Sequence, residues 1–188
     1  NNLLPNPDFS QGNTGFSSDY GSDCSNALPG HYCVSGSPNN VNNNFSACSD
    51  YTTGSGLMLV ANGSLQSSKR VWYKTVPVTP NTDYKFVFHY TPLNNNNKPT
   101  LGASINNFNV NTSGFIGGVC DWWGLCVATW NSGGNTSATL AIRDLTTNAS
   151  GNDFALDGMW FFPCPLPCSA SFSDTPLDNC GKYQFTST

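Results

Sequence analysis

The stretch that decides the fold is D-F-A-L-D-G-M-W-F-F, residues 153–162. Its aromatic and aliphatic residues favour an extended backbone, so the run predicts a β-strand. The chain opens with a second such segment, N-P-D-F-S at residues 6–10, about 150 residues earlier. Asp8 lies in the first segment and Asp157 in the last. We therefore expect a first and a final strand that each carry a carboxylate.

Composition favours a single all-β domain. A chain of 188 residues can bury a sizeable core. All eleven acidic residues are aspartates, and the sequence is crowded with Asn, Gly, Ser and Thr, which suit turns and solvated strand faces. The net charge of -4, without a basic run, argues against a nucleic-acid partner. No span approaches the roughly 18 apolar residues that a membrane helix needs.

Strand-like runs follow a long irregular stretch at residues 13–50. Their spacing is typical of a β-sandwich, and they cover residues 56–61, 71–78, 84–90, 101–105, 125–130, 138–143 and 154–162. Within residues 84–90, alternation places two tyrosines and two phenylalanines on one face, and that face is expected to pack in the core. Residues 79–83, with a proline and two turn-forming polar residues, predict a turn between two strands.

The body is expected to end near residue 162, because prolines at 163, 165 and 167 exclude a central strand. We divide the chain into a sandwich at residues 1–162 and a Pro- and Cys-rich linker with an extended, β-like tail at residues 163–188. The tail has too few apolar residues to form a hydrophobic core of its own. It would dock on its own body, begin a following domain, or add a strand to another copy of the chain.

Eight cysteines favour an oxidising compartment, so we expect a secreted or cell-surface protein. They are Cys24, Cys33, Cys48, Cys120, Cys126, Cys164, Cys168 and Cys180. Bridges between Cys120 and Cys126 and between Cys33 and Cys48 are plausible, and at least one bridge is expected among the last three, although eight cysteines allow 105 pairings. A zinc site is disfavoured, since no second close pair or nearby histidine completes four ligands. Residue 1 is expected to follow a processed leader, or the chain to be a piece of a longer protein.

Five blocks, in order, resemble a known family. Residues 6–9, 13–20, 50–54, 71–76 and 150–157 look like a galactose-binding-like domain of secreted, surface-anchored proteins of gliding Bacteroidetes and their relatives. The resemblance covers about residues 3–162. It implies a jelly-roll sandwich whose first and last strands lie side by side, rather than an enzyme cleft. The tail resembles the first strands of a polycystic-kidney-disease-type immunoglobulin-like domain.

Relatives in the carbohydrate-binding-module branch of this fold carry a structural calcium between the first and last strands. Carried over, the resemblance implies that Asp8 and Asp157 supply ligands, with carbonyls or waters completing the six to eight that calcium takes. Ser10 stands where many relatives have Glu, and Gly158 where a second Asp is common. Each of these two differences removes a negative charge from the implied calcium site. The alternative is that Asp8 caps a turn and Asp157 bonds backbone amides.

Sugar binding fits the aromatic content of 13% and the many asparagines. Sugar rings stack on aromatic planes, and adjacent tryptophans in an extended segment point to opposite sides. We therefore expect an outward ring at Trp123 or Trp122 to form a platform, helped by Asp121, Tyr20, His31 and Tyr32. The alternative is that Trp122, Trp130 and Trp160 are core residues and that a disulfide loop or glycan covers Trp123.

Catalysis finds little support. Neither His31 nor His89 lies in a catalytic motif. The chain has no glutamate, so a catalytic pair of carboxylates for glycoside cleavage would have to be two aspartates. We expect a non-catalytic extracellular adhesion or carbohydrate-binding domain of a larger surface protein, whose partners are glycans or cell-surface polysaccharide. The alternative is a subunit of an extracellular filament, in which the tail adds a strand to the next copy.

Overall fold

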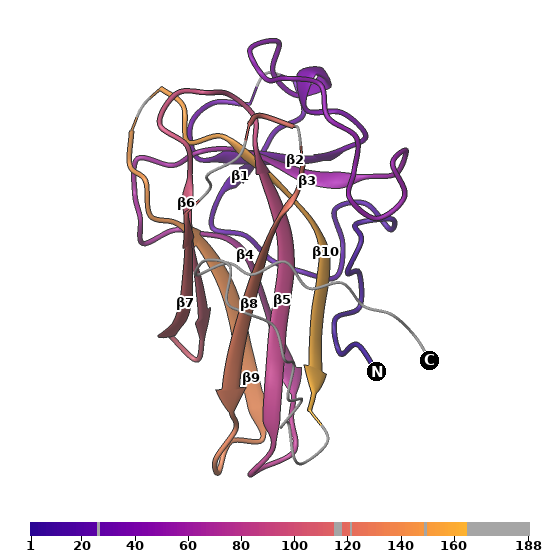
Figure 1. Ribbon diagram of the computed structural model, residues 1–188, viewed down its shortest axis with the longest axis vertical. Coiled ribbons are helices and arrows are strands. Elements are labelled where there is room, and N and C mark those ends of the chain that lie inside the picture. The colour runs from indigo at the N-terminus through magenta and orange to yellow at the C-terminus, as the bar shows by residue number, and fades with distance from the viewer. Residues whose placement is uncertain (26, 115–117, 121, 149, 165–188) are drawn as a thin grey trace, which may run out of the picture.

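The chain folds into two β-sheets that pack face to face (Figure 1). The computed structural model describes residues 1–25, 27–114, 118–120, 122–148 and 150–164. Its elements are β1 (Gly21–Ser22), β2 (His31–Ser35), the 3-10 helix η1 (Pro38–Asn40), β3 (Met58–Asn62), β4 (Arg70–Pro77), β5 (Asp83–Pro92), β6 (Thr100–Ile105), β7 (Phe108–Gly114), β8 (Gly124–Asn131), β9 (Ser137–Asp144) and β10 (Phe154–Pro163). In the described part of the chain no helix is long and apolar enough to span a membrane.

The large sheet has the strand order β1-β2-β3-β10-β5-β8, and the small sheet has the order β4-β9-β6-β7. Apart from the short parallel contact between β1 and β2, neighbouring strands are antiparallel. From β3 to β6, and again from β7 to β10, each strand lies in the sheet opposite the one before it, whereas β1, β2 and β3 follow one another in the large sheet and β6 and β7 in the small sheet. The predicted all-β jelly-roll sandwich is confirmed.

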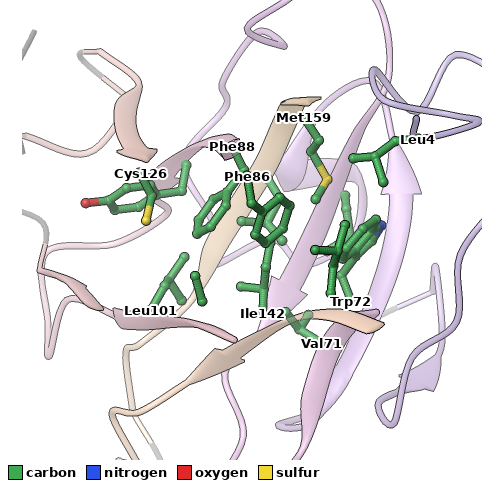
Figure 2. Packing of buried hydrophobic residues seen from close by; sticks show 14 of the residues in the cluster. Leu4, Val71, Trp72, Phe86, Phe88, Leu101, Cys126, Ile142 and Met159 are labelled. Atoms are coloured by element: carbon green, nitrogen blue, oxygen red, sulfur yellow. The ribbon is translucent and has the colours of Figure 1, made fainter. Parts of the chain in front are cut away.

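The inner faces of the two sheets form the main core. The alternation predicted for β5 is confirmed, since Tyr84, Phe86, Phe88 and Tyr90 all lie in this core. Trp72 of β4 stacks on Phe86 from the opposite sheet, with ring centroids 5.9 Å apart. Figure 2 shows the rings of Trp72, Phe86 and Phe88 between the strands, with aliphatic side chains such as Leu101 and Ile142 around them.

The first and last segments of the body lie side by side, as expected. Leu3 N donates to Phe161 O at 2.7 Å, and Met159 N donates to Pro7 O at 2.8 Å. The first segment is nevertheless not a strand, and that prediction is wrong. Its prolines lack N–H groups, and the Asn6 amide donates instead to the carbonyls of Gly12 and Thr14, which closes a compact series of turns.

The irregular stretch before β3 covers part of the large sheet on the side away from the main core. Side chains from this stretch, from the outer faces of β2, β3 and β10 and from the residue after β5 make a second buried group, here called the outer cluster. It comprises Ala27, Cys33, Val41, Phe45, Cys48, Met58, Val60, Leu93 and Ala155. The predicted irregular stretch thus folds back on the sheet and contains two short strands and a 3-10 turn.

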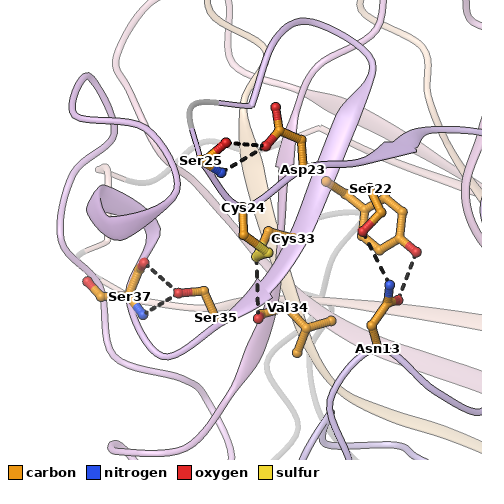
Figure 3. Close-up of a disulfide and its surroundings, with 10 residues drawn as sticks. Asn13, Ser22, Asp23, Cys24, Ser25, Cys33, Val34, Ser35 and Ser37 are labelled. Carbon is orange, nitrogen blue, oxygen red and sulfur yellow. Dashed lines mark hydrogen bonds between the residues drawn. A yellow bond between two sulfur atoms is a disulfide. The ribbon is translucent and has the colours of Figure 1, made fainter.

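The two disulfides of the described residues join Cys24 to Cys33 and Cys48 to Cys120 (Figure 3 shows the first). The predicted pairs Cys33–Cys48 and Cys120–Cys126 are therefore wrong. Cys126 belongs to β8 and points into the main core, whereas Cys120 packs against the outer cluster on the other side of the sheet.

The predicted tail falls almost wholly outside the described residues. β10 ends at Pro163, where the prolines begin, and Cys164 is buried. Cys168 and Cys180 lie outside the described residues, so the bridge expected among the last three cysteines stays a prediction. The same holds for the division at residue 162 and for the proposed roles of residues 165–188.

Candidate functional site

Four rings meet on the outer side of the large sheet, beside the outer cluster; we call them the aromatic cluster. Tyr51 stacks on His89, with ring centroids 3.5 Å apart and ring planes 12° apart. Trp123 contacts Tyr51 edge-on at 6.2 Å, and Trp160 contacts His89 edge-on at 5.6 Å. His89 comes from β5 and Trp160 from β10, so the sheet positions half of the cluster.

The turn at residues 50–56 positions Tyr51. The Asp50 carboxylate accepts hydrogen bonds from Thr53 N at 2.7 Å and Gly56 N at 2.6 Å, which closes the turn. Burial by itself would raise the pKa of Asp50, but these hydrogen bonds have the larger combined effect. The pKa of Asp50 therefore lies below its usual value. The Tyr51 side chain remains 43% exposed, so one part of its ring faces solvent while the other lies on His89.

Gly158 makes room for this stack. It sits at a break in the register between β10 and β5 with φ of +52°, and a Cβ there would lie 2.7 Å from Cδ1 of Tyr51. Only glycine adopts that backbone readily and leaves the space open. The glycine in place of the second aspartate of the resembled family is thus the residue that the Tyr51 ring requires.

The adjacent tryptophans lie just before β8. Trp123 is half-buried against the outer cluster, and its indole Nε1 donates to Ser49 O at 3.3 Å. Trp122 is 41% exposed, so it is the more outward of the pair. The Cys48–Cys120 disulfide joins the segment that carries Tyr51 to the segment that carries both tryptophans. Asp121 lies outside the described residues.

Three other predicted site residues lie elsewhere. Tyr20 and Tyr32 are buried in the main core, where they are only 5% and 7% exposed. The Tyr32 hydroxyl donates to Asn13 Oδ1 at 2.8 Å. His31 is on β2, near the far edge of the sheet, with Nδ1 3.1 Å from Leu28 O. The structure does not bring these three to the aromatic cluster.

A buried carboxylate lies beneath the turn. Asp157 Oδ2 accepts hydrogen bonds from Thr52 N and Thr52 Oγ1, both at 2.9 Å, while Oδ1 has no hydrogen-bond partner among the described residues. Burial raises the pKa of Asp157 to about 6. Burial also lowers the pKa of His89, whose Nδ1 lies 3.1 Å from Gly158 O.

The calcium ligands implied by the resemblance fit only in part. Asp8 Oδ1 is 2.7 Å from the Ser10 hydroxyl and also accepts from Ser10 N, and these bonds lower the pKa of Asp8. Both aspartates therefore make the backbone interactions of the alternative interpretation. No three Asp, His or Cys side chains of the described residues gather as a metal site. Asp157 Oδ1, which is buried and has no hydrogen-bond partner among the described residues, does suit a hard cation.

No family model matches the chain, and no curated protein matches it. Solved structures of similar fold include the CBM22-1 xylan-binding domain of Xyn10C from Paenibacillus barcinonensis, at 12% identity over 83% of this chain and 90% of that one, with a TM-score of 0.51. The tandem CBM22 domains of the same protein align at 14% identity over 87% and 46%, with a TM-score of 0.55. A cyclase from Fischerella sp. TAU aligns at 9% identity over 86% and 96%, with a TM-score of 0.58.

Identities this low establish a shared fold alone. Carbohydrate-binding modules and an enzyme both use this sandwich, so the fold does not decide between binding and catalysis. The expected origin in gliding bacteria is not tested by these similarities.

Proposed function

We propose that the protein is a non-catalytic, extracellular carbohydrate-binding domain and that the aromatic cluster, together with Trp122, forms its sugar platform. The observation that carries the proposal is the Tyr51 ring, part exposed and backed by a parallel His89 ring at 3.5 Å. A ring held in this way presents a fixed flat face, so little conformational entropy is lost when a sugar stacks on it.

The surroundings support this role. The two disulfides of the described residues suit an oxidising, extracellular setting. The xylan-binding domain named above shares the fold. Around the platform, Asp157 is buried and His89 is covered by Tyr51, which favours recognition over acid–base chemistry. We also propose that this domain serves as an adhesion module of a larger surface protein.

Tyr51→Ala is expected to weaken binding to a glycan-array ligand at least tenfold, equivalent to about 1.4 kcal/mol, because it removes the exposed ring of the stack. Trp123→Ala should weaken binding similarly, since Trp123 supports Tyr51. The measurement is a glycan-array screen followed by titration of the best neutral ligand.

Phe108→Ala is the matched control, because Phe108 is 75% exposed and lies in the other sheet, on β7. It should bind as the wild type does. Unchanged binding by a folded Tyr51→Ala variant would contradict the proposed platform.

We also propose that calcium binds at Asp157, with Oδ1 as one ligand and main-chain oxygens of the neighbouring N-terminal segment among the others. A bound calcium would neutralise this buried carboxylate and fix the first segment against β10. The support is the buried, unpartnered oxygen and the family resemblance. Asp8 would contribute only by exchanging its bonds to Ser10 for the metal.

Calcium at about 100 times its Kd is expected to add about 2.7 kcal/mol to the free energy of unfolding. The check is thermal unfolding in EDTA and in calcium. Asp157→Asn should lose the response, whereas Asp23→Asn, which alters a partly exposed carboxylate, should keep it. An equal response in the wild type and Asp157→Asn, or none in the wild type, would rule out this site.

A further inference from the structure

The chain has two arginines, and both lie at the same place in the small sheet. Arg70 of β4 and Arg143 of β9 are directly opposite each other in the antiparallel ladder. Like charges in this position destabilise a sheet. A chain with few cations thus holds two guanidinium groups together, which calls for a compensating anion on or near that face.

Only one of the two has a carboxylate partner among the described residues. Asp19 binds Arg70 through two parallel bonds, from Nε at 2.7 Å and from Nη2 at 2.9 Å. The Arg70 guanidinium also lies 3.6 Å above the centre of the Tyr73 ring. Arg70 is therefore fully engaged within the protein.

Arg143 is held by neutral oxygens instead. Its Nη1 donates to Ser104 Oγ at 2.6 Å and its Nε donates to Ser68 O at 3.3 Å. No acidic group of the described residues forms an ion pair with it. Burial and the neighbouring charge of Arg70 lower the pKa of Arg143, and Asp19, which forms no ion pair with Arg143, offsets this only in part.

Arg143 borders a hollow of about 240 Å³ on the outer face of the small sheet. The lining residues are Gly102, Ala103, Ser104, Asn107, Asn109, Arg143 and Leu145. Gly102 has no side chain to fill the hollow, and a Cβ there would lie only 3.2 Å from Leu145 Cδ1. The hollow combines one preoriented guanidinium, two asparagine amides and one partly exposed aliphatic wall.

We propose that this hollow binds the carboxylate of a uronic acid residue in an acidic polysaccharide. A guanidinium fork matches a planar carboxylate, asparagine amides suit ring hydroxyls, and the Leu145 side chain suits the apolar face of a sugar ring. The net charge of -4 disfavours denser polyanions. This site lies on the sheet opposite the aromatic cluster, so it goes beyond the proposed platform and does not depend on it.

The test is affinity gel electrophoresis in polygalacturonate, dextran sulfate and neutral xylan at two salt concentrations. The wild-type chain should be retarded by polygalacturonate, less so at higher salt. Arg143→Gln should weaken that retardation at least tenfold. Lys85→Gln, which removes one positive charge from the large sheet, is the matched control and should behave as the wild type does.

Asn109→Asp places a carboxylate at the rim of the hollow and is a second variant that leaves Arg143 in place. It should also abolish binding, which keeps the proposal testable if Arg143→Gln fails to fold. Equal losses in Arg143→Gln and Lys85→Gln would indicate diffuse charge attraction and overturn the site. No loss in either variant would show that binding does not depend on Arg143, and would also overturn it. Retardation by dextran sulfate alone would overturn the uronate assignment.

The two binding proposals fail separately. Loss of neutral-glycan binding in Tyr51→Ala with intact polygalacturonate binding supports both sites. Absence of any neutral ligand, together with Arg143-dependent binding of polygalacturonate, would overturn the platform and leave the hollow standing.

Discussion

Replacing Cys48 and Cys120 together by alanine is expected to lower the free energy of unfolding by about 4 kcal/mol. The bridge closes a loop with a sequence separation of 72, so its loss restores much entropy to the unfolded chain. The bridge also ties the turn that carries Tyr51 to the segment that carries Trp122 and Trp123. Glycan binding should therefore weaken even at temperatures where the variant remains folded.

The control is the double alanine variant at Cys24 and Cys33, where the sequence separation is only 9. Its expected loss is smaller, about 3 kcal/mol, and it leaves the aromatic cluster tethered. Urea unfolding of both variants gives the two free energies. A larger loss from the short bridge, or full glycan binding without the long one, would contradict this description of the platform.

Raising the pH from 5 to 8 in EDTA should lower the free energy of unfolding by about 4 kcal/mol, at about 1.4 kcal/mol per pKa unit. Burial raises the pKa of Asp144 to about 7 and the pKa values of Asp153 and Asp157 to about 6. Asp144 and Asp153 lie near one end of the sandwich. Asp144 Oδ2 accepts from Asn152 Nδ2 at 2.6 Å, and Asp153 Oδ1 accepts from Gly63 N at 3.1 Å.

The sign follows from the direction of these pKa shifts. Each folded-state pKa lies above that of the unfolded chain, so the folded protein binds protons more tightly, and this stabilisation is full below about pH 4. It is lost as the pH rises through 6 and 7. Asp8, Asp19 and Asp50, whose pKa values are lowered, act in the opposite direction only in more acidic solution. His89, whose pKa burial lowers, acts in the opposite direction within this range and offsets part of the loss.

Chemical denaturation at several pH values measures the slope of the free energy of unfolding against pH. Asp144→Asn should flatten it, because that side chain no longer titrates, whereas Asp23→Asn, at a partly exposed position where the pKa is lowered, should leave it unchanged. Stability that rises between pH 5 and 8 would show that the buried carboxyl groups are ionised at little cost.

Much of the fold was predictable because its signals are local. The period-two alternation in β5 and the proline-terminated run of β10 identified two central strands and their inner faces. β7 was missed, since it is an edge strand of mostly polar residues whose Val110 packs on the core. β2 was missed because it is a short strand in a stretch dominated by turn-forming residues.

The site was less predictable because it depends on contacts between distant segments. The tryptophan pair was identified from its sequence, but the stack of Tyr51 on His89 requires the register break at Gly158, which no local pattern announces. The bridge between Cys48 and Cys120 likewise depends on the irregular stretch folding over the large sheet. Close spacing in the sequence favoured Cys126 as a partner, yet β8 directs that thiol into the core.

The indole N–H signals of the five tryptophans offer the most direct test of sugar binding, by NMR titration with the best ligand from the glycan array. The platform predicts saturable shifts for Trp122 and Trp123, with no change for Trp72, which is buried between the sheets. Saturable binding that leaves both Trp122 and Trp123 unperturbed would contradict the proposed function of this surface.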